Sequence, residues 1–270
     1  MKVLVIPDIH GRKFWRKAIA DNIGKVDKVV FLGDYLDPYG NEIEENPELM
    51  EYEYFYDAKN LLNMLNDIIG LKKNEPDKYI LLTGNHTDSY IWSKFHSATR
   101  TDYRNWEKYH KFFSQNLEYF NLVFTSGTTI FSHAGFTKEW TQLVWEELEF
   151  PEDELSSIME IAICLEDTPL NKFDNSYVKL ISYFSKYRGG FDLCSSCEWS
   201  DLREHIDMSK VVDSYGNIIP IGEDGIYQVF GHTQVIRPVI TDKWACLDCR
   251  KAFIVDTLTH DIEDASDSSL

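Results

Sequence analysis

Five short stretches of the chain place side chains that commonly bind metal ions directly after an apolar run. In order along the chain, these side chains are Asp8 with His10, Asp34 with Asp37, Asn85 with His86, His133, and His232. Any single one would fit an ordinary hydrogen-bonded role at the end of a strand. Together they offer carboxylate, imidazole and amide donors, a mixed oxygen and nitrogen set that suits Mn²⁺, Fe or Zn²⁺. The pattern predicts a metal centre assembled from separate parts of the sequence.

The apolar runs before the first three of these places are typical of buried strands. KVLVI at 2–6, KVVFL at 28–32 and YILLT at 79–83 are short and rich in β-branched residues or leucine. Between the last two runs, Asn46 and Pro47 fit the start of a helix whose apolar residues recur at helical spacing until Gly70. In such a β-α-β arrangement, ligands bind outside the carboxyl ends of the strands.

The second half of the chain adds more strands to this α/β pattern. The stretches LVFTSGTTIFSHAG, IYQVFGHTQ, PVIT, KWACLDC and AFIVDT predict strands, with SGTT and SYGN as turns. A helical insert is expected over residues 151–166. Because no linker rich in Gly, Ser or Pro divides the chain, we expect one domain over 1–270, ending in an acidic, solvated tail at about 261–270.

Charge and cysteine content narrow the class of protein. The formal net charge of −18 argues against nucleic acid or an anionic membrane as the main partner, because both attract clustered Lys and Arg. The apolar part of MKVLVIPDIHG is too short for a signal peptide, and no run is long enough to span a membrane. An odd number of cysteines, five, fits a reducing compartment. We therefore expect a cytoplasmic protein.

Five ordered blocks of the sequence carry a family resemblance. DIHG, GDYLD, GNH, SHAG and GHT resemble the signature blocks of the calcineurin-like metallophosphoesterase superfamily, most closely its phosphoprotein (serine/threonine) phosphatase branch. The resemblance extends from Lys2 to about Thr257. It implies an α/β, four-layer metallophosphoesterase fold, in which two packed mixed β-sheets are flanked by helices, and a binuclear metal centre at one edge.

The resemblance also implies which residues hold the two ions. Asp8, His10 and Asp34 would bind the first divalent metal ion. The second would be held by Asp34, Asn85, His133 and His232. Asp34 would thus bridge the ions, and a shared carboxylate relieves the repulsion between two cations that lie about 4 Å apart. Manganese is the expected metal, with iron, zinc and magnesium as alternatives.

The same resemblance assigns roles to the remaining residues of the GDYLD and GNH blocks. Asp37 would hydrogen-bond His86 and orient its imidazole, so that His86 can protonate the leaving alkoxide. The simpler alternative for Asp37 is a side chain that stabilises the turn ahead of Pro38.

The sequence departs from the family pattern where phosphate is bound. The phosphoprotein phosphatases usually read GDYVDRG and RGNHE, and here Pro38 and Thr83 stand where their two arginines would be, while Thr87 replaces the glutamate. Arg188 in YRGGF and Arg203, on either side of the WSD triplet, are candidate substrate contacts, and surface salt bridges are the alternative. The basic, aromatic segment 90–113 is another candidate, although an amphipathic helix pair packed on the sheet would explain it equally well.

Two CxxC pairs suggest a separate structural metal site. Cys194 and Cys197, with Cys246 and Cys249, could form a tetrahedral zinc site. The alternative for Cys246 is a small apolar residue within a buried strand.

These observations predict a metal-dependent phosphoesterase that hydrolyses a phosphate ester by attack of a metal-bridged hydroxide. A phosphorylated protein or a small phosphomonoester is the expected substrate. A hydrolase of dinucleoside polyphosphates or other nucleotides is one alternative, and a catalytically silent binding protein on the same fold is another.

Overall fold

The computed structural model describes residues 1–38, 58–92, 99–148, 157–208 and 218–266. Its backbone forms two compact units, and each is described by itself. Unit 1 contains residues 1–120 and 250–270, and unit 2 contains residues 121–249. Whether both units behave as a single domain stays a prediction.

Unit 1 is built on a mixed sheet with strand order β11-β10-β1-β2-β3-β4. At its centre, β1 (Lys2–Ile6), β2 (Lys28–Phe31) and β3 (Tyr79–Leu82) run parallel. They coincide with the three apolar runs, and most of their side chains are buried. The sheet is completed by β4 (Phe120–Asn121) and by β10 (Phe253–Asp256), which pairs antiparallel with β1. The prediction of three adjacent buried strands is confirmed.

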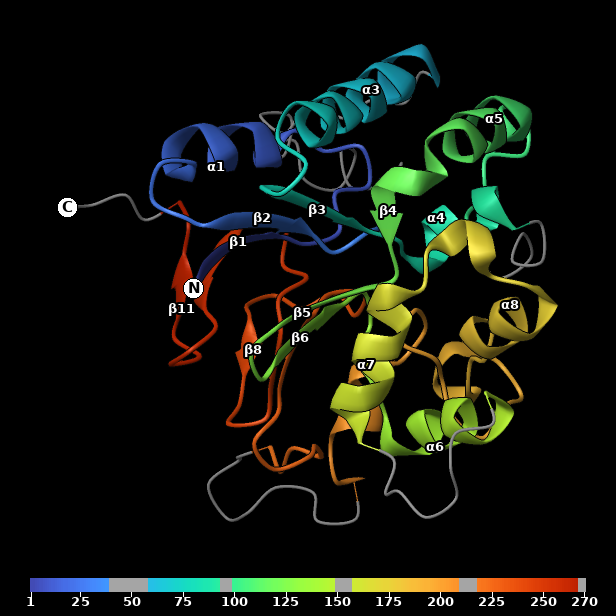
Figure 1. Ribbon diagram of the computed structural model, residues 1–270, viewed down its shortest axis with the longest axis vertical. Coiled ribbons are helices and arrows are strands. Elements are labelled where there is room, and N and C mark those ends of the chain that lie inside the picture. Colours follow the sequence, from blue (N-terminus) through green and yellow to red (C-terminus); the bar gives the residue numbers. More distant parts are fainter. Residues whose placement is uncertain (39–57, 93–98, 149–156, 209–217, 267–270) are drawn as a thin grey trace. The chain divides into compact units, whose positions relative to one another are not determined.

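Helices α1 (Phe14–Asn22) and α3 (Ala58–Asn74) cover one face of this sheet (Figure 1). The apolar stripe predicted for α3 is buried as expected, but the helix continues for a turn beyond Gly70. A glycine inside a helix costs about 1 kcal/mol relative to alanine, a penalty that the buried apolar stripe of α3 can outweigh. The predicted start at Asn46 and Pro47 lies outside the described residues.

The segment 90–113 is represented by parts of two helices, as the amphipathic alternative predicted. Helix α4 (Asn85–Ile91) begins at the GNH block, and α5 (Trp106–Asn116) is followed by the 3₁₀ turn η3 (Leu117–Tyr119). Aromatic side chains join them, since the rings of Tyr90 and Tyr109 meet edge to face with their centroids 5.1 Å apart.

The predicted solvated tail at 261–270 requires a correction. Strand β11 (Ile262–Asp264) pairs antiparallel with β10, and Ala265 after it is buried. The carbonyl oxygen of Ala265 accepts a hydrogen bond of 3.0 Å from Asn22 Nδ2 of α1. The acidic composition concealed this strand, because three residues are too few for an alternating pattern to stand out.

Unit 2 contains a second mixed sheet, with strand order β5-β6-β7-β9-β8. Strands β5 (Val123–Ser126) and β6 (Thr129–Ser132) form a hairpin, and β7 (Tyr227–Phe230) runs parallel to β6. Strand β9 (Trp244–Cys246) is parallel to β7, and β8 (Val239–Ile240) is antiparallel to β9. Two mixed sheets with helices confirm the predicted α/β fold class.

The helices of unit 2 follow the hairpin in the chain. They are α6 (Lys138–Glu147), α7 (Ile158–Asp167) and α8 (Asn175–Ile181), with 3₁₀ turns η4 (Leu170–Lys172), η5 (Lys186–Arg188) and η6 (Leu202–His205). Helix α7 corresponds to the predicted insert. Ser157 and Glu160 cap its start reciprocally, while residues 151–156 lie outside the described part of the chain. Among the described helices, none has both the length and the apolar character needed to cross a membrane.

Gly33 allows the ends of β2 and β3 to approach closely. Its φ of +110° lies in the region that favours glycine, and a Cβ atom there would meet the carbonyl oxygen of Thr83 at 2.2 Å. Any side chain at this position would therefore push the two strand ends apart.

His205 joins two loops of unit 2. Its Nε2 lies 2.9 Å from Ser200 Oγ and 3.2 Å from the carbonyl oxygen of Ala134. Burial lowers the pKa of His205 to about 4, outweighing the hydrogen bond to Ala134 and the charge of Asp201. The folded protein therefore holds this imidazole neutral near pH 7.

We expect Gly33→Ala to lower the free energy of unfolding by about 3 kcal/mol, because it combines a strained φ with overpacking against backbone. Urea unfolding measures the loss. Gly24→Ala is the matched control, since a Cβ at Gly24 meets nothing within 4 Å. Equal losses in the two variants would contradict the close approach of the strand ends.

A second prediction concerns acid stability. The unfolded chain protonates His205 near its ordinary pKa of 6.5, whereas the folded chain does so only near pH 4. Stability present above pH 6.5 should therefore fall by about 3 kcal/mol as the pH drops through this window. Chemical unfolding with a chelator present, repeated between pH 7 and pH 4, should show a flatter dependence for His205→Gln than for the wild type. Parallel curves would contradict a buried, neutral His205.

Candidate metal and catalytic site

The carboxyl ends of β1 and β2 bring three potential metal ligands together in unit 1. Ligand atoms of Asp8, His10 and Asp34 all lie within 4.8 Å of one another, and all three residues are buried. The loops that carry them are joined by backbone, since the amide of His10 donates to the carbonyl of Asp34 at 2.8 Å. This is the first group of ligands that the sequence predicted, in one place.

The state of His10 suits metal binding. Burial lowers its pKa well below the ordinary value, and the charge of Asp34 only partly opposes this. Its Nδ1 donates to the carbonyl of Leu36 at 2.7 Å, which leaves Nε2 with a lone pair 3.7 Å from Asp34 Oδ2. A neutral imidazole held by its other nitrogen is the usual form of a histidine ligand. The donor set therefore fits a divalent cation.

The GNH block lies beside this group. The backbone amide of His86 donates to Asp34 Oδ1 at 3.0 Å, and Asn85, the first residue of α4, is buried next to it. The imidazole of His86 meets that of His10 edge to face, with ring centroids 5.0 Å apart. The residues after β3 therefore contact potential ligands that follow β1 and β2.

Asp37 orients His86 directly. The distance between His86 Nδ1 and Asp37 Oδ2 is 2.7 Å, and both side chains are buried. The other carboxylate oxygen, Oδ1, accepts a hydrogen bond from the hydroxyl of Tyr90. Asp37 therefore does more than stabilise a turn, since its carboxylate lies between an imidazole and a phenol.

Sequence reasoning missed Tyr90 as part of this network. Tyr90 is fully buried, and its hydroxyl oxygen also accepts from the amide of Asp102 at 2.8 Å. Burial, then the charge of Asp37, raises its pKa, so the phenol stays protonated as a donor. Its position one helical turn after His86 was the available signal, because residues four apart on a helix share a face.

Two arginines near these ligands were also missed. Arg100 Nη2 donates to the carbonyl of Asp37 at 2.9 Å, and the buried Arg12 lies 3.3 Å from the carbonyl of Asp8. Their charges both help to lower the pKa of His10. Arg100 lies within the basic segment 90–113, which the sequence marked only as a whole.

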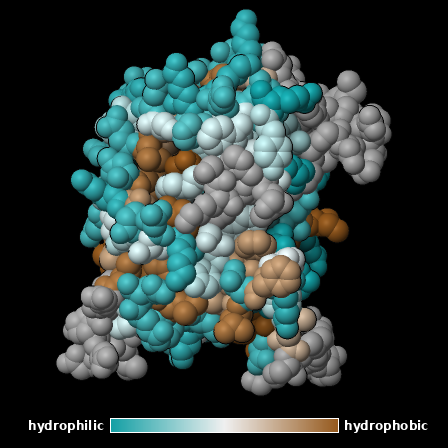
Figure 2. Space-filling model, turned by 90° about the vertical axis from the view of Figure 1, so that its right-hand side faces the viewer, coloured by the Kyte–Doolittle hydropathy of each residue, from teal (hydrophilic) through white to brown (hydrophobic). Residues whose placement is uncertain are grey.

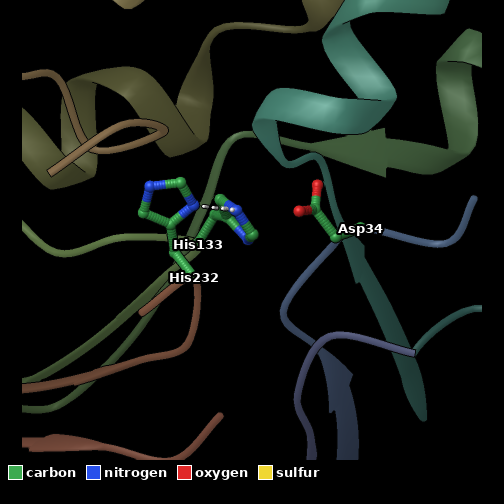
Figure 3. Close-up of side chains that lie close together, drawn as sticks. All are labelled: Asp34, His133 and His232. Carbon is green, nitrogen blue, oxygen red and sulfur yellow. Dashed lines mark hydrogen bonds between the residues drawn. The ribbon is translucent and has the colours of Figure 1, made fainter. Parts of the chain in front are cut away.

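Unit 2 contributes a pair of histidines. His133 follows β6 and His232 follows the parallel neighbour β7, so their rings meet at one sheet edge. His133 Nε2 and His232 Nδ1 are 3.1 Å apart (Figure 3). Figure 3 also draws Asp34 of unit 1, in the loop that follows β2. Two imidazole nitrogens this close, one of them buried, could serve as ligands of one ion.

Both predicted substrate arginines pair with Asp201. Arg188 Nε lies 3.0 Å from Asp201 Oδ2, and Arg203 Nε lies 2.6 Å from Oδ1. Arg188 also donates to Thr233 Oγ1 at 2.6 Å, which ties it to the residue after His232. The salt-bridge alternative is therefore observed for each, while contact with a phosphate stays a prediction.

The four cysteines proposed as zinc ligands do not converge. Within the described residues, the groups of side chains that could hold a metal ion contain no cysteine. None of the five cysteines forms a disulfide. Cys246 is buried in β9, where its Sγ lies 3.3 Å from the carbonyl of Thr233 and packs with Phe230 and Trp244. The structure supports the alternative of a buried apolar residue for Cys246.

The sequence and the fold were compared with those of known proteins. The family model described as calcineurin-like phosphoesterase matches residues 1–235. The fold is similar to a cold-active protein-tyrosine phosphatase of a psychrophilic Shewanella, with a TM-score of 0.57 and 13% identity over 98% of this chain and 80% of that one.

A protein serine/threonine phosphatase from Saccharomyces cerevisiae, with similarity to human phosphatase PP5, has a TM-score of 0.50 at 12% identity, over 98% of this chain and 79% of that one. At such identities the likeness concerns the fold alone. No curated protein matched the sequence. Because the family model covers most of its length, the chain belongs to the calcineurin-like phosphoesterase family and is a metal-dependent phosphoric ester hydrolase.

Proposed function

We propose that the protein hydrolyses a phosphate monoester, on a protein or a small molecule, with the help of two divalent cations. The observation that carries this proposal is the buried group Asp8, His10 and Asp34 beside the hydrogen-bonded pair of His86 and Asp37. A metal site next to an oriented proton donor is what ester cleavage needs.

The first cation would be held by Asp8, His10 and Asp34. The second would be held by Asn85, His133 and His232 together with Asp34, as the ordered sequence blocks imply. The pairing of His133 with His232 supports this within unit 2. When bound, such ions supply positive charge to the phosphoryl oxygens and activate a water molecule. Manganese is the proposed metal.

The residues of the chain supply the remaining chemistry. Asp37 holds Nδ1 of His86, so the opposite nitrogen, Nε2, is left to give a proton to the departing oxygen of the substrate. Tyr90 restrains the second oxygen of Asp37 and so limits its rotation. A carboxylate gripped at both oxygens can hold the imidazole in one orientation.

Positive side chains must also balance the phosphate, because Pro38 and Thr83 offer no charge. Arg100 is one candidate in unit 1, since it donates to the backbone of Asp37 and its charge, after that of Arg12, lowers the pKa of His10. In unit 2, Arg188 is anchored beside His232. We propose both as phosphate contacts, because a guanidinium can bind two phosphoryl oxygens at once.

A substrate panel with Mn²⁺ tests the function. It contains p-nitrophenyl phosphate, bis-p-nitrophenyl phosphate, a phosphopeptide and diadenosine tetraphosphate. We expect turnover of the monoester and the phosphopeptide. Preferential cleavage of diadenosine tetraphosphate would instead indicate a nucleotide hydrolase, and no turnover with bound metal would indicate a silent binding protein.

Asp34→Asn should remove both ions together, because its carboxylate is proposed as their shared ligand. Metal analysis of the purified protein by mass spectrometry measures this. Asp67→Asn, at an exposed aspartate that pairs with Arg16, should leave the metal content unchanged. One ion still fully bound to the Asp34 variant would exclude the bridging role.

His86→Asn should keep both ions yet slow hydrolysis roughly 10²- to 10⁴-fold, the usual contribution of a positioned general acid. An alkyl phosphate should lose more than p-nitrophenyl phosphate, because an alkoxide needs the proton and a nitrophenolate does not. Steady-state rates on the two esters measure this selectivity.

Asp37→Asn and Tyr90→Phe should show the same selectivity in milder form, because each disturbs only the orientation of the donor. Equal losses on both esters, or loss of metal from the His86 variant, would show that His86 has a different role.

A further inference from the structure

Residues 189–193 of unit 2, here named the strap, expose two large apolar side chains. Phe191 and Leu193 each have a relative exposure of 102%, so neither is covered by the part of the chain that the structure describes. On the face drawn in Figure 2, hydrophilic residues cover most of the surface and hydrophobic ones gather in separate patches. Single exposed apolar residues are common, but two that alternate on one short loop suggest a contact surface.

The strap is held in place, so this exposure is not that of a loose loop. The amide of Gly190 donates to the carbonyl of Ser185 at 2.9 Å, and a Cβ atom at Gly190 would lie 1.8 Å from the carbonyl oxygen of Phe184. Asp192 Oδ2 accepts from the amide of Phe184 at 3.0 Å. Because the side chain of Asp192 points inward, those of Phe191 and Leu193 on either side point outward.

The strap begins beside His232, one of the proposed metal ligands in unit 2. It directly follows η5, whose last residue, Arg188, donates to Thr233 Oγ1 and lies 3.5 Å from the carbonyl oxygen of His232. A substrate whose phosphate reached Arg188 would therefore have the neighbouring part of its structure close to the strap.

Two exposed basic side chains lie next to the strap, among acidic ones that include the half-buried Asp192 and Glu204. Lys186 and Arg203 both lie over the ring of Tyr187, with their charged groups 5.5 Å and 5.0 Å from its centroid, and both are exposed. The carboxylate of Asp201, which pairs with the arginines, is buried beneath them. In a chain of net charge −18, Lys186 and Arg203 are thus two exposed basic groups that an acidic stretch of a partner could approach.

We propose that the strap docks the polypeptide on either side of a phosphorylated residue. Phe191 and Leu193 would contact apolar side chains of that polypeptide, while Lys186 and Arg203 would attract its negative charge. The proposal rests on the proposed function and narrows its substrate class to phosphoproteins, because a polypeptide carries apolar side chains beside its phosphorylated residue that could contact Phe191 and Leu193.

The test uses a Phe191→Ser, Leu193→Ser double variant and two phosphopeptides, one with leucine and phenylalanine near the phosphorylated residue and one with serines in their place. KM for the apolar peptide should rise about tenfold or more, because the variant removes two apolar contacts that are each only partly buried at a surface. The rate on p-nitrophenyl phosphate, the metal content and KM for the serine peptide should stay unchanged. Leu258→Ser, at another largely exposed apolar residue, is the matched control.

Binding of the fluorescent apolar peptide, followed by anisotropy in a His86→Asn background, separates docking from catalysis. Weaker binding in the double variant supports the strap even if the wild type proves to be catalytically silent, which would overturn only the proposed function. Unchanged peptide binding and KM would overturn the docking proposal. An equal loss of activity on p-nitrophenyl phosphate would also overturn it. The same holds if the wild type is a dimer, the double variant is a monomer, and peptide binding and KM do not change.

Discussion

The close approach of three strand ends around Gly33 is the constraint on which the site of unit 1 depends. Without a side chain at Gly33, the loop after β2 lies against the carbonyl of Thr83, and the backbone of Asp34 accepts a hydrogen bond from His10. Asp8, His10 and Asp34 are thereby buried together, although burying a carboxylate costs several kcal/mol unless a positive charge compensates it. Bound cations, together with Arg12 and Arg100, would provide that charge.

The second consequence of this packing is an ordered imidazole, that of His86. Asp37 belongs to the same loop as Asp34, and His86 follows β3. The contact between the loops therefore sets the hydrogen bond of 2.7 Å between the two side chains as well as the geometry of the ligands. Tyr90 and Arg100 hold Asp37 from its carboxylate and its carbonyl. One change at a strand end would disturb both the group of Asp8, His10 and Asp34 and the pair of His86 and Asp37.

In unit 2, adjacent strands and loops likewise bring several polar side chains into contact. His133 and His232 meet because β6 and β7 are parallel neighbours, and His205 ties the loop after β6 to Ser200. Asp201 orders Arg188 and Arg203 as well as the start of η6. These buried contacts leave apolar and basic side chains of the adjoining strap and turn exposed to solvent, where a substrate could reach them.

The local pattern was sufficient for the three central strands of unit 1 and for the fold class, and it marked Asp8, His10 and Asp34, which the structure brings together. Short apolar runs and the residues after them are properties of neighbours in sequence. This pattern could not decide which side chains pair. Asp201 pairs with Arg188 and Arg203, and within the described residues no group that could hold a metal ion contains a cysteine, because tertiary contacts decide which side chains meet. Strand β11 also escaped notice, since its stability comes from hydrogen bonds to β10 rather than from its own acidic residues. The amino-acid sequence thus determined which side chains are chemically able to bind a metal or transfer a proton. Tertiary packing determined which of them lie in contact.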